Sequence, residues 1–245
     1  MTTSSYHEFM KNPAIIILPI IAIIGLLSLS LFLKQSIAAA KTDYSPQKHA
    51  VSATPGYRAD YLSAMERKVL DEINIARTNP LKYAEFAKDL RNSMAGRMIK
   101  RPGKPTILTQ EGIAAVDEAI AFLRSVRLVT ALSPSRGLSM AARDQVRNQG
   151  PKGTIGHEGP DGSQINHRAD RYGKWTALIG ENISYGAETP RERVLALIID
   201  DGVPSRGHRK NIFNPLLRMI GIACGPHAKF SSMCVMDVAG GYKEK

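Results

Sequence analysis

The chain has 245 residues, of which 43% are hydrophobic and 22% charged, values that are ordinary for a globular protein large enough to bury a sizeable core. It carries 33 Lys and Arg against 22 Asp and Glu, and this formal net charge of +11 favours an anionic partner. The cations are scattered along the chain, so we expect no nucleic acid as partner and favour an anionic envelope polymer or an acidic lipid.

An apolar run without any charged residue extends from Ala14 to Leu33, which is long enough for a helix to cross a membrane. It is followed by Ala38-x-Ala40, the small-residue pattern that signal peptidases accept. Two interpretations of residues 1–40 therefore stay open, a cleaved signal peptide and an uncleaved transmembrane anchor. Both predict export, to the periplasm, to the extracellular space or to the outer face of the membrane that the segment anchors. Residues 41–56 are rich in Pro and Ser and are expected to form a linker.

The following part of the chain is predicted to begin with several helices. Apolar residues recur at helical spacing from Leu62 to Ala76, Ser63-x-x-Glu66 offers a capping box at the start, and Asn79-Pro80 ends the helix. Further helices are expected at about 81–90, 111–123 and 138–149, with a basic Gly/Pro loop over 96–105.

A later helix has the clearest start in the chain. Thr189-Pro190-Arg191-Glu192 combines an N-cap threonine, proline at the first helical position and glutamate at the third, which predicts a helix from Pro190 to about Asp200. Asp200 and Asp201 lie at its C-terminal end, where the helix dipole disfavours negative charge. Either they are two solvated residues of a turn, or one of them faces a functional site.

Two short apolar runs near the C-terminus, 219–224 and 233–239, flank a Gly-Pro loop and predict a β-hairpin. The hairpin would place Cys224 opposite Cys234. Export to an oxidising compartment favours a disulfide between them, and two buried free thiols are the alternative. Helices around a two- or three-stranded antiparallel sheet predict an α+β fold, layered αβα, in one domain over 57–242.

Three glycine-flanked segments carry the side chains that bind borderline metals or move protons near neutral pH. They contain His157, Glu181 and His208, within Gly-His-Glu-Gly, Gly-Glu-Asn-Ile and Gly-His-Arg-Lys-Asn. Two imidazoles and a carboxylate are the ligand set of open zinc sites, and without an ion they form a structural network instead. The other histidines, in the tail, the linker or exposed loops, are expected to be bystanders: His7, His49, His167 and His227. The chain has neither the His-Glu-x-x-His of common zinc peptidases nor a Gly-x-Ser-x-Gly elbow.

These segments, together with Asn74-x-x-Arg77 and the Asn211-Ile212 that ends the third, resemble a bacterial member of the CAP superfamily, also called SCP-like. This is the family of cysteine-rich secretory, antigen 5 and pathogenesis-related 1 proteins. The resemblance covers most of residues 61–238. It implies an αβα sandwich, usually secreted, with a cleft of two histidines and two acids that binds a divalent metal such as zinc in several members.

Carried over to this chain, the resemblance makes His157 and His208 the cleft histidines and Glu181 the first acid. The second acid, normally a glutamate, falls at Asp200 or Asp201. The chain also departs from the family pattern in a helical insertion at about 81–130 and in its last strand, where Met233-Cys234-Val235 replaces an aromatic one.

Two classes of function follow, and the sequence does not decide whether the chain is an enzyme. We favour a binding or interaction module in the cell envelope or extracellular space, because the acid set is altered and no nucleophile is evident. The alternative is a metal-dependent hydrolase or peptidase, in which His157, His208 and an acid hold zinc and Glu181 acts as general base.

Overall fold

The computed structural model describes residues 59–245. The signal peptide or anchor expected at 1–40 and the linker expected at 41–56 lie outside the described residues. Within residues 59–245, no helix combines the length and the hydropathy that crossing a bilayer requires.

The centre of the fold is a four-stranded sheet with the order β4-β6-β7-β5. Its strands are β4 (Ser133–Pro134), β5 (Gly173–Tyr185), β6 (Met219–His227) and β7 (Ser231–Glu244). β6 and β7 pair antiparallel, as predicted, and β5 adds a third antiparallel strand beside β7, whereas the short β4 adds a parallel edge to β6. The two apolar runs near the C-terminus predicted the β6–β7 hairpin, whereas no sequence pattern predicted β4 or the long edge strand β5.

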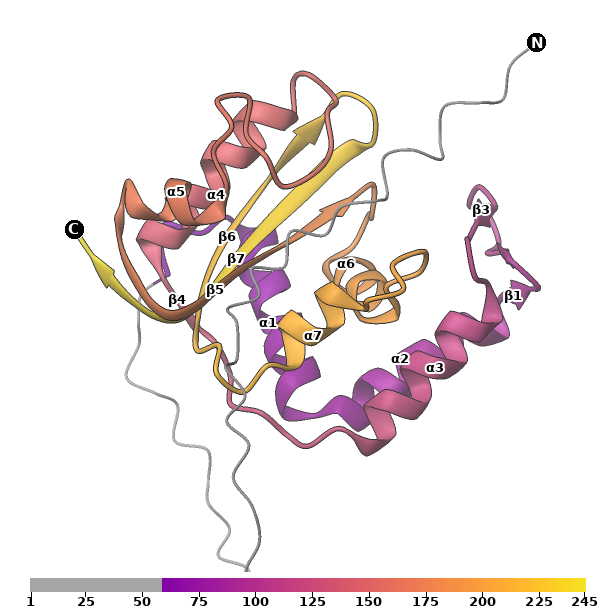
Figure 1. The fold of residues 1–245 in the computed structure, drawn as a ribbon. Coiled ribbons are helices and arrows are strands. Elements are labelled where there is room, and N and C mark those ends of the chain that lie inside the picture. Colours follow the sequence, from indigo (N-terminus) through magenta and orange to yellow (C-terminus); the bar gives the residue numbers. More distant parts are fainter. Residues whose placement is uncertain (1–58) are drawn as a thin grey trace, which may run out of the picture. The chain divides into compact units, whose positions relative to one another are not determined.

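Helices cover both faces of this sheet, and the fold is therefore the expected α+β sandwich (Figure 1). One layer holds α4 (Arg136–Gln149) and α5 (Ile165–Asp170). The other holds α1 (Ala64–Thr78), α6 (Pro190–Ile199) and α7 (Gly207–Phe213). Alternate side chains of β6 and β7 enter the two layers: Ile222 and Met236 pack with α1 and α6, whereas Ala223 and Val235 pack with α4.

Several predicted caps are confirmed. Ser63 accepts from the Glu66 backbone N–H, and the Glu66 carboxylate accepts from the Ser63 N–H, so the capping box of α1 is complete. Thr189 and Glu192 form the same box at the start of α6.

The expected insertion contains two helices, α2 (Pro80–Asn92) and α3 (Ile113–Ser125), which pack on each other. The loop expected at 96–105 is wrong in part, because a three-stranded sheet lies between these helices. Its antiparallel strands are β1 (Met94–Ala95), β2 (Met98–Ile99) and β3 (Ile107–Leu108). Strands of two residues give no alternation that a sequence could reveal.

Buried polar side chains join distant segments around α1. Arg77 is fully buried, and its guanidinium donates to the backbone carbonyls of Thr130, Ile212 and Leu217. Asn74 exchanges two hydrogen bonds with the backbone of Leu132. The polar pair that the family resemblance singled out therefore holds α1 to the end of the insertion and to the segment before β6.

The C-terminal hairpin carries the predicted disulfide. Cys224 and Cys234 lie directly opposite each other and are bonded. The turn is shorter than expected, since β6 continues to His227. His227 is buried, which corrects its assignment to an exposed loop. Its Nδ1 accepts from the N–H groups of Lys229 and Phe230, and its Nε2 lies 2.9 Å from the Thr154 carbonyl, so the ring is used within the turn.

Candidate functional site: two histidine–carboxylate pairs

The first pair joins the loop after α4 to strand β5. His157 Nδ1 lies 2.8 Å from Glu181 Oε1, with 51% of the His157 side chain exposed and only 2% of the Glu181 side chain. Arg168 of α5, which is fully buried, donates to the other Glu181 oxygen at 2.5 Å and to the His157 carbonyl at 3.1 Å. Both Glu181 oxygens are thus occupied, and His157 is held at its ring by Glu181 and at its backbone carbonyl by Arg168.

The loop that carries His157 is held at the residue before it. Gly156 has φ of +110°, a conformation that L-residues rarely adopt. Its N–H donates to the Tyr185 hydroxyl, and its carbonyl accepts from Gln149 at 2.6 Å. Burial raises the pKa of Tyr185 to about 12, so the hydroxyl stays protonated and donates to Gln149 Oε1.

The second pair lies between the end of α6 and the start of α7. His208 Nδ1 is 2.6 Å from Asp200 Oδ1, and the His208 backbone N–H donates to the other oxygen at 2.9 Å. Asp200 ends α6 in the left-handed conformation, with φ of +58°, which turns its buried carboxylate toward α7. The unfavourable position at the helix end is explained by this pairing.

Asp201, the other candidate acid, points elsewhere. Its carboxylate accepts from the backbone N–H groups of Gln110 and Glu111, just before α3. The structure therefore brings together His157, His208, Glu181 and Asp200 and leaves Asp201 outside this group.

The two imidazoles face a common space. Their ring centroids are 6.4 Å apart, and the ring planes differ by 35°. With each Nδ1 bound to a carboxylate, the Nε2 atom of neither ring has a hydrogen-bond partner among residues 59–245. The same residues contain no group of three or more His, Cys, Asp or Glu side chains arranged around one ion. The arrangement offers at most two direct protein ligands, each oriented by a carboxylate.

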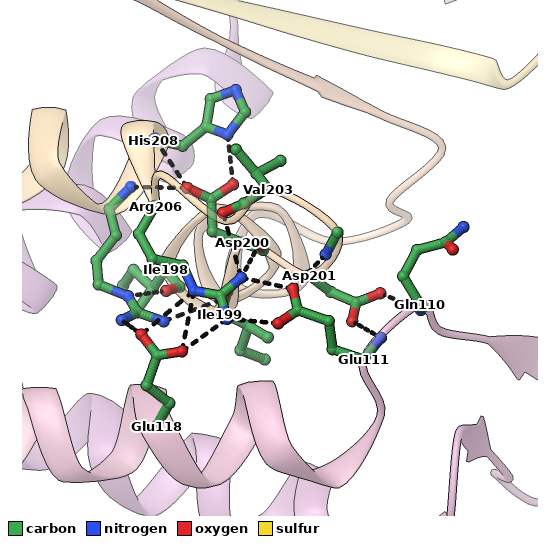
Figure 2. A network of polar contacts seen from close by, with 12 residues as sticks. Gln110, Glu111, Glu118, Ile198, Ile199, Asp200, Asp201, Val203, Arg206 and His208 are labelled. Carbon is green, nitrogen blue, oxygen red and sulfur yellow. Dashed lines mark hydrogen bonds and ion pairs between the residues drawn. The ribbon is translucent and has the colours of Figure 1, made fainter. Parts of the chain in front are cut away.

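A network of ion pairs fixes the loop that carries His208 to α3 of the insertion, as Figure 2 shows. Arg206 donates to both Glu111 and Glu118, and Arg209 also donates to Glu118. The bonds from Arg206, followed by those from Arg209, lower the pKa of Glu118 to about 2. Glu111 in turn accepts from the Gly202 backbone N–H. The insertion thus fixes one side of the site, a link that the sequence motifs did not reveal.

Asp237 is a buried acid next to the site that the sequence analysis missed. It lies opposite Glu181 on β7, and within the described residues neither of its oxygens has a hydrogen-bond partner. Burial and the neighbouring Glu181 raise the pKa of Asp237 well above its usual value, which favours the neutral form. A lone acid inside the apolar run 233–239 was the signal that could have revealed it.

Comparisons with known proteins match parts of this chain to one family model and to solved structures. Residues 118–238 match the family model described as CAP, cysteine-rich secretory protein family. An extracellular protein containing an SCP domain from Bacillus anthracis str. Ames is 18% identical, with a TM-score of 0.37, over 49% of this chain and 37% of that one. An outer surface protein from Borrelia burgdorferi is 21% identical, with a TM-score of 0.39, over 48% of this chain and 80% of that one. No curated protein matches the chain.

Proposed function

The chain belongs to the CAP superfamily, and on that premise we propose that it is an exported binding module in which His157 and His208 hold a divalent cation. The cation would bridge the protein to an anionic ligand of the cell envelope or extracellular space. The single observation that carries this proposal is the pair of imidazoles, each backed by a buried carboxylate and each with a free Nε2.

The donor set fits such an ion. A ligating histidine usually gives its second ring nitrogen to a carboxylate, which fixes the tautomer and raises the basicity of the ligand, and both histidines are bonded in this way. Imidazoles bound through Nε2 place their ring centroids roughly 3 Å from the metal, so two rings on one tetrahedral ion stand about 5 Å apart. The centroids of His157 and His208 are 6.4 Å apart, so the two rings would have to approach each other by about 1 Å to share an ion. Zinc is one of the ions that imidazole ligands suit, and its remaining positions would be open to water or ligand.

Binding is better supported than hydrolysis because of how Glu181 is held. A general base needs a carboxylate oxygen directed at the reacting water. In this site one Glu181 oxygen faces His157 Nδ1 and the other accepts from Arg168. Glu181 is therefore arranged to orient an imidazole. The net charge of +11 supports an anionic ligand for the same cleft.

Export is supported by the disulfide. Bonds such as Cys224–Cys234 form and persist in oxidising compartments and are rare in the cytosol. The apolar run at 14–33 supplies a segment by which a secretion system could recognise the chain.

Calorimetric titration with zinc tests the cation site. We expect one ion per chain, an affinity reduced at least tenfold in His157→Ala and in His208→Ala, and a loss of about 10- to 100-fold in Glu181→Gln, which keeps the shape but removes the orienting charge. His167→Ala is the matched control, since this exposed histidine lies on α5 outside the pair. Absence of zinc uptake, or uptake that neither histidine variant changes, would overturn the cation site. Zinc-dependent cleavage of an ester or peptide probe, lost in both variants, would replace binding by hydrolysis.

A further inference from the structure

Four arginine side chains in the described part of the chain are almost completely buried: Arg77, Arg168, Arg193 and Arg209. Three of them are well compensated. Arg168 and Arg209 form ion pairs with carboxylates, and the guanidinium of Arg77 donates to four backbone carbonyls. Arg193 of α6, with an exposed fraction of 2%, has no carboxylate partner among residues 59–245, and its hydrogen bonds go to two serines alone.

These hydrogen bonds satisfy the Arg193 guanidinium only in part. Its Nη2 donates to the Ser232 hydroxyl at 2.7 Å. Its Nη1 reaches the carbonyl and the hydroxyl of Ser184 at 3.4 and 3.5 Å, which is long for a hydrogen bond. Its Nε is buried and has no hydrogen-bond partner within the described residues. A buried cation with so few acceptors is costly unless an anion completes its contacts.

The carboxylate next to Arg193 in the chain is engaged elsewhere. One oxygen of Glu192 accepts from Arg101, and the other accepts from the Thr189 backbone N–H in the capping box. Burial lowers the pKa of the Arg193 guanidinium, and the Glu192 charge offsets this shift in part. An arginine nevertheless keeps its charge at neutral pH. Arg193 therefore carries a buried positive charge without an anion bonded to it.

The position of Arg193 in its helix adds to the demand for negative charge. The N-cap of α6 is Thr189, so Arg193 lies in the first turn. The partial positive charge of a helix start disfavours a cation there and favours an anion. The helix dipole and the incomplete contacts of the guanidinium are separate features, and both favour an anion at this place.

The hydroxyl groups around the guanidinium are available as donors. The Ser184 hydroxyl donates to no acceptor within residues 59–245, although Arg193 Nη1 approaches its oxygen. The Ser232 hydroxyl donates to the Ala187 carbonyl only at 3.4 Å. Because a hydroxyl hydrogen rotates freely about its bond, both serines can donate to a neighbouring anion without losing a short hydrogen bond. Arg193 Nε and the two hydroxyls thus offer donors to an acceptor with negative charge.

Solvent lies close to this place on two sides. Ser232 is partly exposed at the start of β7. Ser184 lies near the end of β5 and lines a cavity of about 520 Å³ beside α6. Arg193 itself does not line this cavity and is separated from it by Ser184. A small ion can therefore reach the guanidinium past either hydroxyl, whereas a large ligand cannot.

We propose that Arg193 binds one halide-sized monovalent anion, with the hydroxyls of Ser184 and Ser232 as further donors. A single negative charge matches the single positive charge of the guanidinium, whereas a divalent anion would leave an excess charge buried. The bound ion ties the start of α6 to the end of β5 and the start of β7. Neither His157 nor His208 takes part, so the site can be tested with metal removed.

Thermal unfolding in EDTA at constant ionic strength, with chloride replacing gluconate, tests the site. We expect a dissociation constant of about 10–100 mM, because a one-atom ligand gains little binding free energy. At a chloride concentration about ten times this constant, the melting temperature should be about 3–6 °C higher than in gluconate alone. Bromide should act as chloride does.

Variants of two neighbouring arginines show whether the effect comes from this site. Arg193→Met should remove the rise in melting temperature, and Arg193→Lys, which keeps the charge but loses the planar donors, should weaken chloride binding several-fold. Arg191→Met is the matched control, because Arg191 forms an ion pair with Glu72 and 49% of its side chain is exposed. This variant should keep the full rise.

Anomalous diffraction from crystals soaked in bromide locates the ion. We expect a bromide peak beside the Arg193 guanidinium in the wild-type protein. A melting temperature that does not depend on chloride, a rise that Arg193→Met retains, or wild-type crystals without this peak would overturn the proposal. If Arg193→Met does not fold, a chloride affinity that Arg193→Lys leaves unchanged has the same force. Zinc titration of the wild-type protein in gluconate reports on the cation site separately.

Discussion

The buried ion pair between Arg168 and Glu181 gives the sharpest test of how the site is built. Both side chains are excluded from water, with exposed fractions of 0% and 2%. Arg168 also donates to the carbonyls of His157 and Ser163, so it supports the loop as well as the acid. Arg168→Met keeps the length of the side chain and removes its charge and its donors. It would leave the Glu181 charge buried, with His157 as its only remaining partner.

Removing one partner of a buried pair typically costs about 3–5 kcal/mol, and we expect Arg168→Met to lower the free energy of unfolding by this amount. Glu181→Gln should cost less, about 2 kcal/mol, for two reasons. The amide oxygen still accepts from Arg168, and the loss of the Glu181 charge removes one of the two main causes that raise the pKa of Asp237, while burial, the larger one, remains. The double variant should lose less than the sum of the two single losses, because the unpaired charge is then absent.

Urea unfolding at pH 7, followed by circular dichroism, measures these differences. Equal m-values for all variants would show that the free energies can be compared directly. A loss for Glu181→Gln as large as that for Arg168→Met, or strictly additive losses, would refute the idea that Asp237 compensates. Zinc titration of each folded variant adds an independent measurement, since each change removes one contact that holds His157.

Three further predictions concern stability. The pKa of Asp237 is higher in the folded than in the unfolded chain, so the free energy of unfolding falls as pH rises from about 4 toward the folded pKa. Asp237→Asn should flatten this fall, which urea titrations from about pH 4 to about pH 8 would measure. Arg77→Met leaves buried carbonyls without a donor and should lower the free energy of unfolding by at least about 2 kcal/mol, since each unsatisfied buried acceptor costs about 1–3 kcal/mol. Arg77→Lys should rescue little of this loss because its ammonium lacks the planar fork, and wild-type stability of either variant would contradict the role of this side chain. Cys224→Ala/Cys234→Ala should lower the free energy of unfolding by about 2.5 kcal/mol, the chain entropy of a short closed loop, and an unchanged urea midpoint would argue against this.

The elements predicted from the sequence are those with strong local signals. Capping boxes marked α1 and α6, and two apolar runs marked the hairpin with its disulfide. β5 was missed because it mixes Gly, Glu and Asn with apolar residues, and its polar side chains serve the site rather than an alternating pattern. No sequence pattern predicted β1, β2 or β3, because strands of two residues form only through pairing with their neighbours.

The site could be predicted by residue type but not by arrangement. His157, Glu181 and His208 were found from their segments, and the choice between Asp200 and Asp201 required the left-handed end of α6, which no local pattern specifies. Asp237 pairs with Glu181 only through the register of β5 on β7. These are contacts between residues far apart in the chain, and local propensity carries no information about them.

The two imidazoles come from opposite sides of the sandwich. The loop of His157 is bonded to α4 and α5, whereas His208 is bonded to the end of α6. An ion bound by both rings would link the two helical layers across the edge strand β5. Because it would bind the folded chain only, the melting temperature should rise with the concentration of free zinc.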